Sequence, residues 1–381
     1  MVEWESILLS HFIARKCNHM ILDYFIHKLT EENPPEANET KCINSFGKIC
    51  ECKICIEICP EHAVKLKGKS VVYDSKLCTK CGMCKSKCPT QAIMLKVTGE
   101  NDLINCADEK KNLVFSCSLE GGEGNLNISC LNALHPELIA SLIMMYKDKK
   151  FHFNLSKCEK CKLGCDDSLF REALNKAVSF TESLGIDVSY EIHMEEKELS
   201  NLIVEEISRR DLFKLVRKES GNFALKTINT IIDNEDSQLS YRKILLINMK
   251  NLRSEHKRNC SNIFWEYWDV NTDCDGCGKC ESVCPGKAWK IENTETNVNL
   301  YHNPGNCYKC GLCEKICTKK AIIVGDVGNV DLWEFRLKRE INLSICKTCN
   351  RKFISYDQDK DQCDVCRKKE LLRRKISTSL N

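Results

Sequence analysis

The sequence lacks any apolar segment of the length that a membrane-spanning helix needs, roughly 20 residues. Its best apolar run, residues 138–145, suffices only for a buried helix. Glu3 and Glu5 stand where a signal peptide would be basic, and no small-residue cleavage site follows them. We therefore expect a cytoplasmic protein with no membrane span.

Net charge is also low, because 57 Lys and Arg residues are balanced by 54 Asp and Glu residues, which leaves a formal net charge of +3. Nucleic acid is therefore not the expected partner. The chain has no flavin or nicotinamide fingerprint, and the Gly-rich run at 121–124 lacks the Lys-Ser/Thr ending of a phosphate-binding loop. Its nine histidines form no cluster along the sequence, and no nucleophile–base motif is present. No catalytic residue is predicted.

Cysteine, in contrast, is abundant, with 29 among the 381 residues. Most cysteines lie in groups separated by two or three residues, too close together for several mutual disulfides, and their total is odd. Thiolates that converge on metal explain such groups better than a secreted disulfide scaffold does. The sequence therefore predicts a metal-binding protein of a reducing compartment.

The most regular groups have the spacing Cys-x2-Cys-x2-Cys-x3-Cys, which begins at Cys78, Cys274 and Cys307. A cubane cluster needs four thiolates at tetrahedral corners. Gaps of two residues let the backbone curl around the cluster and aim its N–H groups at the cluster sulfurs. Gly278 and Gly311 permit the left-handed backbone that this curl requires.

These motifs resemble those of bacterial two-cluster ferredoxins, in which the last cysteine of each motif binds the other cluster. The resemblance implies two dicluster modules with four [4Fe–4S] clusters in all. One cluster would use Cys274, Cys277, Cys280 and Cys317, a second Cys284, Cys307, Cys310 and Cys313, and a third Cys59, Cys78, Cys81 and Cys84. The positions at which such modules place small core residues are Ala63, Ala92, Ala288 and Ala321.

Two positions depart from the family pattern. Thr318 replaces the proline that usually follows the last cysteine, which removes a turn constraint but no ligand. Ile49 stands where the first motif requires a cysteine. The fourth cluster would therefore use Cys52, Cys55 and Cys88 together with Cys50, the nearest thiol, or with Cys42, which a loop could deliver. A three-iron cluster or a labile site is the alternative.

The middle of the chain predicts a small α/β domain, with strands at 113–115, 126–129 and 151–155 and helices at 136–147 and 169–184. Its cysteines lie near strand ends, which meet at one edge of such a sheet. This arrangement resembles the small iron–sulfur (delta) subunit of methyl-viologen-reducing hydrogenase. The resemblance implies an additional [2Fe–2S] or other metal centre on Cys117, Cys130, Cys158 and Cys161, with Cys165 as a substitute. Buried structural thiols are the alternative.

The tail contains two Cys-x2-Cys pairs, formed by Cys346, Cys349, Cys363 and Cys366. Their spacing favours a zinc ribbon with tetrahedral Zn²⁺, and a single iron bound as in rubredoxin is the other option. Basic residues at 367–369 and 373–375 predict a terminal helix that is either solvated or docked on an acidic partner or nucleic acid.

The expected fold class is α+β multidomain, with two ferredoxin-like dicluster modules flanking a small α/β domain and a helical linker, and a zinc-ribbon-like tail. The expected parts are an N-terminal helical segment and linker (1–40), module 1 (41–97), the small α/β domain (98–194), the helical linker (195–265), module 2 (266–326) and the tail (327–381).

We expect an electron carrier, or an electron-transfer subunit of an oxidoreductase in anaerobic metabolism, that passes single electrons through its clusters to or from a partner oxidoreductase. One alternative is a redox-responsive regulator that uses the zinc ribbon and basic tail. Another is an iron–sulfur subunit of a catalytic oxidoreductase complex. Salt-dependent binding of nucleic acid would favour the regulator, and turnover without a partner would favour the enzyme.

Overall fold

The structure, a computed structural model, describes residues 35–47, 51–95, 103, 110–203, 240–252, 261–326, 332–355 and 360–379. Most of the expected N-terminal helical segment and linker (1–40), most of the expected helical linker (195–265) and Cys50 lie outside these residues. Within the described ranges, no helix is both long and apolar enough to cross a bilayer.

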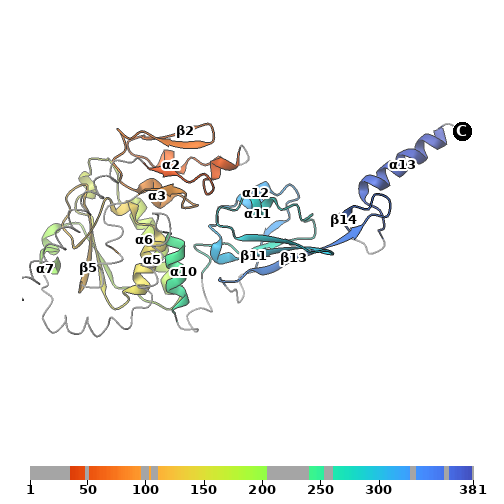
Figure 1. The fold of residues 1–381 in the computed structure, drawn as a ribbon. Helices are drawn as coiled ribbons and strands as arrows, with labels where there is room; N and C mark the ends of the chain where they lie inside the picture. The colour runs from red at the N-terminus through yellow and green to blue at the C-terminus, as the bar shows by residue number, and fades with distance from the viewer. Residues whose placement is uncertain are drawn as a thin grey trace, which may run out of the picture.

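Module 1 is a small α+β unit at the N-terminal end of the described chain (Figure 1). Its elements are β1 (Glu36–Ala37), the 3-10 helix η1 (Ile43–Phe46), α2 (Ile54–Glu57), β2 (Val64–Lys67), β3 (Ser70–Tyr73), α3 (Met83–Lys87) and β4 (Ile93–Met94). Strand β1 pairs antiparallel with β4, and β2 forms a hairpin with β3. The first and last strands thus close the module around the two cysteine motifs.

Module 2 repeats this plan. Its elements are β9 (Trp268–Val270), α11 (Lys279–Ser282), β10 (Trp289–Asn293), β11 (Asn297–His302), η6 (Pro304–Asn306), α12 (Leu312–Ile316) and β12 (Ile322–Val324). Strand β12 pairs antiparallel with β9, and β10 with β11. The duplication seen in the cysteine spacing therefore extends to the strand pairing.

The first strand of the tail that the structure describes is part of the sheet of module 2. Strand β13 (Arg336–Ile345) pairs with β11 through Asn342, and its last three residues pair with β14 (Lys352–Ile354). Helix α13 (Asp364–Ser379) follows and extends away from the rest of the chain (Figure 1). Residues 336–342, which we expected in the tail, thus pair with the sheet of module 2.

The middle unit is built on a parallel sheet of order β6-β5-β7-β8. Its elements are β5 (Asn112–Cys117), β6 (Leu126–Ile128), η2 (Leu131–Ala133), α5 (Pro136–Met145), β7 (Lys150–Asn154), η3 (Cys158–Lys160), α6 (Ser168–Ser183), β8 (Tyr190–His193), η4 (Glu196–Glu198) and α7 (Ser200–Ile203). Phe115, Phe151 and Phe153 stack on one face of the sheet, and Phe170 of α6 packs against them. Helix α10 (Tyr241–Lys250), from the expected linker, packs against α5.

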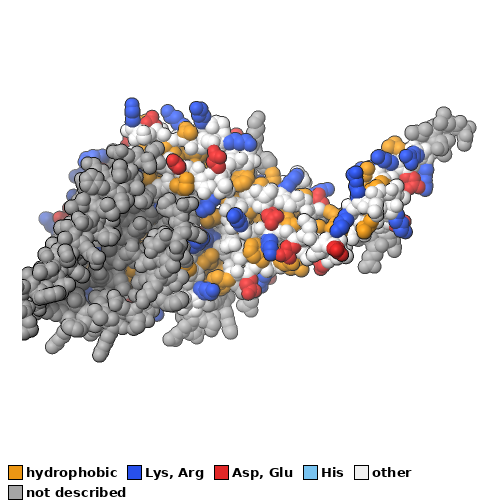
Figure 2. Space-filling view, viewed as in Figure 1, with side chains coloured by type: hydrophobic (Ala, Val, Ile, Leu, Met, Phe, Trp, Pro, Cys, Tyr) orange, Lys and Arg blue, Asp and Glu red, His pale blue; other side chains and the backbone are white. Residues whose placement is uncertain are grey.

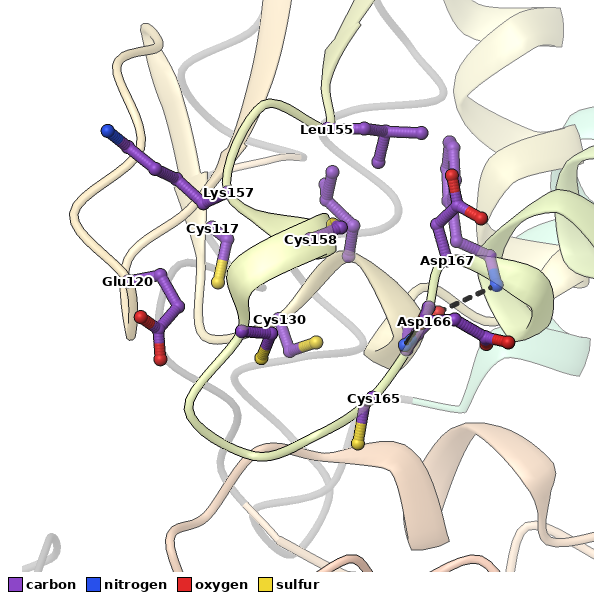
Figure 3. Close-up of a pocket in the computed structure, with 13 residues that line it drawn as sticks. Cys117, Glu120, Cys130, Leu155, Lys157, Cys158, Cys165, Asp166 and Asp167 are labelled. Atoms are coloured by element: carbon purple, nitrogen blue, oxygen red, sulfur yellow. Dashed lines mark hydrogen bonds between the residues drawn. The ribbon is translucent and has the colours of Figure 1, made fainter. Parts of the chain in front are cut away.

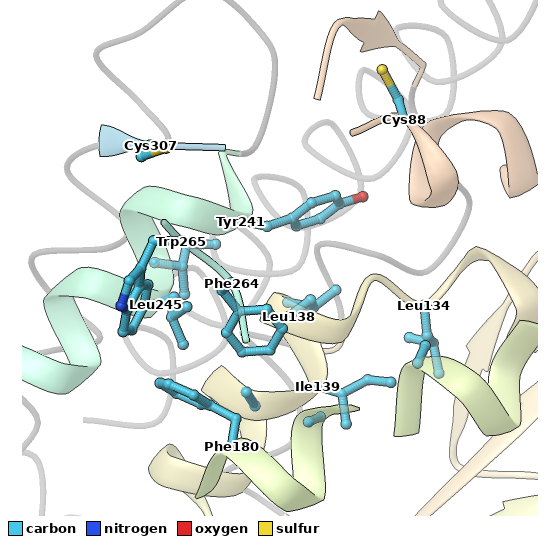
Figure 4. Packing of buried hydrophobic residues seen from close by; sticks show 14 of the residues in the cluster. Cys88, Leu134, Leu138, Ile139, Phe180, Tyr241, Leu245, Phe264, Trp265 and Cys307 are labelled. Atoms are coloured by element: carbon cyan, nitrogen blue, oxygen red, sulfur yellow. The ribbon is translucent and has the colours of Figure 1, made fainter. Parts of the chain in front are cut away.

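One continuous apolar cluster joins the three units. It includes Leu138 of the middle unit, Cys88 of module 1 and Cys307 of module 2. Figure 4 shows Tyr241 of α10 between these two cysteines, above Phe264 and Phe180. The two modules are therefore docked on the middle unit through shared core.

Candidate iron–sulfur centres

Module 2 brings its eight motif cysteines together as two sets of four. The first set, which we name site C, consists of Cys284, Cys307, Cys310 and Cys313, and these residues line one pocket. Burial raises the pKa values of Cys307, Cys310 and Cys313, and the charge of Cys284 raises each of them further. The last cysteine of one motif thus lies with the first three of the other, which is the exchange that the resemblance implied.

The second set, site D, consists of Cys274, Cys277, Cys280 and Cys317. Burial raises the pKa of Cys274, and the charges of Cys277 and Cys317 add to the effect. Cys277 is the exposed member of the set, so site D lies at the surface of module 2.

Module 1 contains a matching pair of sets. Site A consists of Cys59, Cys78, Cys81 and Cys84, which line one pocket. Burial raises the pKa of Cys84, and the charges of Cys81, Cys78, Cys55 and Cys59 raise it further. Because Cys55 belongs to the other motif set, the two sets of module 1 are neighbours.

Site B contains Cys52, Cys55 and Cys88, and the structure places Cys42 beside them. Burial raises the pKa of Cys55 to about 12, and the charges of Cys88, Cys52 and Cys42 contribute. Cys42 is itself buried. Of the two thiols that the sequence left open, Cys42 therefore lies in this set, and Cys50 is outside the described residues.

Asn44 explains how Cys42 reaches site B. Its side-chain amide donates to the carbonyl of Cys52 at 2.8 Å, and its carbonyl oxygen accepts from the N–H of Cys52 at 2.9 Å. These two bonds hold η1 against the first motif. No motif spacing indicates Asn44, so sequence analysis missed this residue.

The first motif also lacks the turn that the other three make. Gly82, Gly278 and Gly311, which follow the second cysteine of their motifs, have φ of 88°, 78° and 70° and begin helices α3, α11 and α12. Lys53 holds the same position in the first motif and has φ −117°. A Lys side chain disfavours the left-handed backbone, so this segment takes another path.

A repeated hydrogen bond marks the fourth cysteine of every motif. The N–H group four residues later donates to its sulfur at 3.1–3.3 Å, in the pairs Ala63 to Cys59, Ala92 to Cys88, Ala288 to Cys284 and Ala321 to Cys317. All four alanines are buried. Backbone N–H groups aimed at sulfur are typical of cluster ligands, so this repeated bond suits a ligand role for each fourth cysteine.

The donor chemistry of sites A to D fits iron–sulfur clusters. Burial disfavours a bare thiolate, and it raises the pKa values of Cys55 and Cys280 to about 12. Without a cation, the Cys55 and Cys280 thiols would therefore remain protonated at neutral pH. Cluster binding replaces those protons, which couples binding to folding.

The middle unit gathers five cysteines around one pocket, which we name the five-cysteine pocket. Its members are Cys117, Cys130, Cys158, Cys161 and Cys165, which come from the ends of β5, β6 and β7 and from the loop before α6. A hydrogen bond from Cys130 lowers the pKa of Cys117 to about 6. Figure 3 shows Cys117, Cys130 and Cys158 around the loop that carries η3, with Cys165 on the side of module 1.

Site A adjoins this pocket. Cys81 packs with Cys130 and Met83, and Cys165 lies at the edge of the same small cluster. Burial raises the pKa of Cys165 to about 11, and the charges of Cys161 and Cys81 raise it further. Helix α3 supports the contact, because Ser86 donates to the carbonyl of Leu134 at 3.3 Å.

Site B adjoins site C across the interface of the two modules. One pocket is lined by Cys52 and Pro89 from module 1 and by Cys310 from module 2. Burial raises the pKa of Tyr308 to about 12, and Cys88 is among the charges that raise it. Cys88 of site B is therefore close enough to Tyr308, which follows Cys307 of site C, to affect its pKa.

A buried ion pair fixes this junction. Arg242 of α10 binds Glu137 of α5 through two hydrogen bonds of 3.1 and 2.6 Å. Its remaining N–H groups donate to the carbonyls of Gly305, Cys307 and Phe264. Gln91 of module 1 donates to the same Glu137 carboxylate at 3.0 Å. The pair thus connects all three units, and no motif spacing pointed to it.

The tail cysteines form a separate site. The sulfur atoms of Cys346, Cys349, Cys363 and Cys366 all lie within 4.8 Å of one another, which suits a single metal ion. The N–H of Cys363 donates to the sulfur of Cys346 at 3.3 Å and is the main cause that lowers the pKa of Cys346 to about 6. This set could therefore bind a metal ion.

Comparison with known proteins agrees with the geometry of the modules. Residues 273–321 match the family model of a 4Fe-4S dicluster domain, and residues 71–94 match that of a 4Fe-4S binding domain. The chain is 39% identical over 63 residues to an uncharacterized ferredoxin of Methanocaldococcus jannaschii. That alignment covers 16% of this chain and 42% of the relative. The chain therefore contains two ferredoxin-type 4Fe–4S domains, one in each module, which support a role in iron–sulfur electron transfer.

Proposed function

We propose that the protein carries single electrons along a row of four [4Fe–4S] clusters, which are bound at sites A, B, C and D. A redox partner or oxidoreductase complex exchanges electrons with each end of the row. The observation that carries this proposal is the order of contacts. The five-cysteine pocket adjoins site A, A adjoins B, and B adjoins C. Site D shares a module with C.

Each cluster, when bound, would take up and release one electron. The protein supplies the surroundings that tune this step. The N–H groups of the four buried alanines would bond ligand sulfurs, and such bonds raise reduction potentials. Arg242 adds a buried positive charge near Cys307, which favours added negative charge at site C.

For site B we propose Cys42, Cys52, Cys55 and Cys88 as the ligands. The buried position of Cys42, its electrostatic contact with Cys52 and Cys55, and the anchor at Asn44 support this choice over Cys50.

The two ends of the row differ. At one end, we propose that the five-cysteine pocket holds an additional centre of the [2Fe–2S] kind, next to site A. At the other end, the exposed Cys277 offers site D to a partner protein. This arrangement supports a cytoplasmic carrier or electron-transfer subunit over a regulator, because sensing requires one cluster and not a row.

For the tail we propose Zn²⁺ at the four-cysteine site, with α13 as a docking helix for an acidic redox partner. Lys and Arg side chains lie along this helix beside exposed Val365, Leu371 and Leu372 (Figure 2).

Reductive titration of anaerobically purified protein tests the function. We expect reversible uptake of about four electrons per chain by the cubanes, with additional uptake if the five-cysteine pocket holds iron. The Cys284→Ser variant should take up about one electron fewer, whereas Cys17→Ser, outside every motif, should match the parent. Absence of reversible uptake, together with salt-dependent nucleic-acid binding, would instead support the regulator.

A further inference from the structure

Two histidines that are far apart in sequence meet on the parallel sheet of the middle unit. His152 lies in β7, and His193 ends the neighbouring strand β8. The register of these strands places His152 opposite Glu191. His152 Nδ1 is 3.0 Å from His193 Nε2 and 3.4 Å from Glu191 Oε2, and His193 Nε2 is 3.7 Å from Glu191 Oε2. The three side chains thus present three ligand atoms toward one point.

We infer that His152, Glu191 and His193 bind one divalent metal ion of the zinc type, with water as the remaining ligand. Zinc bonds of about 2.0–2.1 Å in tetrahedral geometry place neighbouring ligand atoms about 3.4 Å apart. The three observed separations lie within about 0.4 Å of that value. Two imidazoles and one carboxylate with an open position form a donor set that zinc uses in proteins.

The surrounding residues orient these ligands as a metal site requires. His193 Nδ1 lies 3.0 Å from a carboxylate oxygen of Glu198, so this nitrogen carries the proton and Nε2 presents its lone pair to the site. Lys150 binds the other oxygen of Glu191 at 2.5 Å and leaves Oε2 directed at the histidines. A carboxylate behind a metal-binding histidine is a common second layer of such sites.

Burial separates the site from bulk water but leaves an entrance. His152 and His193 are 1% and 6% exposed, whereas the Glu191 side chain is 49% exposed. The ion and its water would enter past Glu191.

A hydrogen-bonded relay from His152 through His193 to Glu198 is the competing interpretation. In that arrangement His152 Nδ1 donates to His193 Nε2. The buried His152 Nε2 has no partner among the described residues in either arrangement. Metal binding needs only that the two nitrogens separate by a few tenths of an ångström. Zinc binding distinguishes the two interpretations.

The test uses the full-length, cluster-loaded protein dialysed anaerobically against Zn²⁺, with zinc counted per chain. We expect the parent to bind one zinc more than the Glu191→Gln and His193→Gln variants, or to bind it at least tenfold more tightly. The control Glu195→Gln changes an exposed carboxylate outside the site and should match the parent. Zinc X-ray absorption should show nitrogen and oxygen ligands in the parent that both variants lack.

Equal zinc content and equal affinity in the parent and both variants would overturn the inference and leave the relay. If His193→Gln does not fold, Glu191→Gln decides, because it alters a half-exposed side chain. Zinc bound by the tail contributes sulfur ligands equally in all variants. The result does not depend on the electron-transfer function, since it requires neither reduction of the clusters nor a partner.

Discussion

Ile49 is the residue at which the sequence departs most from the ferredoxin pattern. Residues upstream of it compensate for the missing cysteine. Asn44 binds the backbone of Cys52 twice, and this brings the buried Cys42 to site B. A loop that folds back is held by fewer constraints than a motif that curls around its cluster. We therefore expect site B to be the most oxygen-labile of the four.

Replacing Cys42 tests this assignment. Cys42→Ser should lower the iron content by up to about four atoms per chain, the content of one cubane, and speed bleaching of the visible absorbance in mild air. The same change at Cys50 should leave both unchanged, because Cys42 supplies the thiolate. The opposite pattern would show that Cys50 is the ligand, and no effect of either change would favour a three-thiolate site.

At the scale of elements, helix α10 connects the units through Arg242. Burial is the largest single influence on the pKa of Glu137 and raises it, but the charges of Arg242 and His135 and the hydrogen bonds from Arg242 and Gln91 together outweigh burial, so the net shift is downward. The pair therefore contributes stability above the unfolded pKa of the carboxyl group, and this stability is lost as the pH falls through the folded pKa.

Removing Arg242 should destabilise the junction strongly. Arg242→Met leaves the buried Glu137 carboxylate without its cation, which costs about 3–5 kcal/mol. Hydrogen exchange at neutral pH should show the loss at α5 and α10. The control Arg374→Met breaks an exposed ion pair on α13 and should cost at most about 1 kcal/mol. Unchanged protection in Arg242→Met would mean that apolar packing alone holds the units together.

Strand β13 determines how far the tail can unfold. Its first part pairs with β11 of module 2, and only its end pairs with β14. We predict that chelation of the tail metal exposes amides from 344 to 366, while amides from 336 to 343 stay protected and the cubanes remain reducible. Hydrogen exchange and iron analysis check this, with Cys363→Ser as the matching variant. Loss of cubane iron on either treatment would show that the tail is required by module 2.

At the scale of the whole molecule, motif spacing predicted which thiols meet within a module, because two-residue gaps and exchanged fourth ligands are local rules. The hydrophobic pattern likewise placed strands where β5 and β7 lie. Spacing carried no information on how the units dock. The contact of Cys81 with Cys130, the Arg242 junction and the meeting of His152 with His193 depend on residues that are dozens of positions apart.

Because both modules dock on the middle unit, the cysteine sites form a row of neighbours. The row runs from the five-cysteine pocket to the exposed Cys277. Electrons can pass along such a row only if adjacent clusters interact. Clusters that are close enough for transfer also broaden one another's magnetic resonance spectra when both are reduced.

The most direct test is therefore electron paramagnetic resonance of the fully reduced protein, compared with that of Cys284→Ser. We predict about four cubane spins per chain, with spectra broadened by their neighbours. Loss of site C should remove about one spin and narrow the signals of sites B and D. Four unbroadened signals, or signals of B and D that do not respond to Cys284→Ser, would contradict the row.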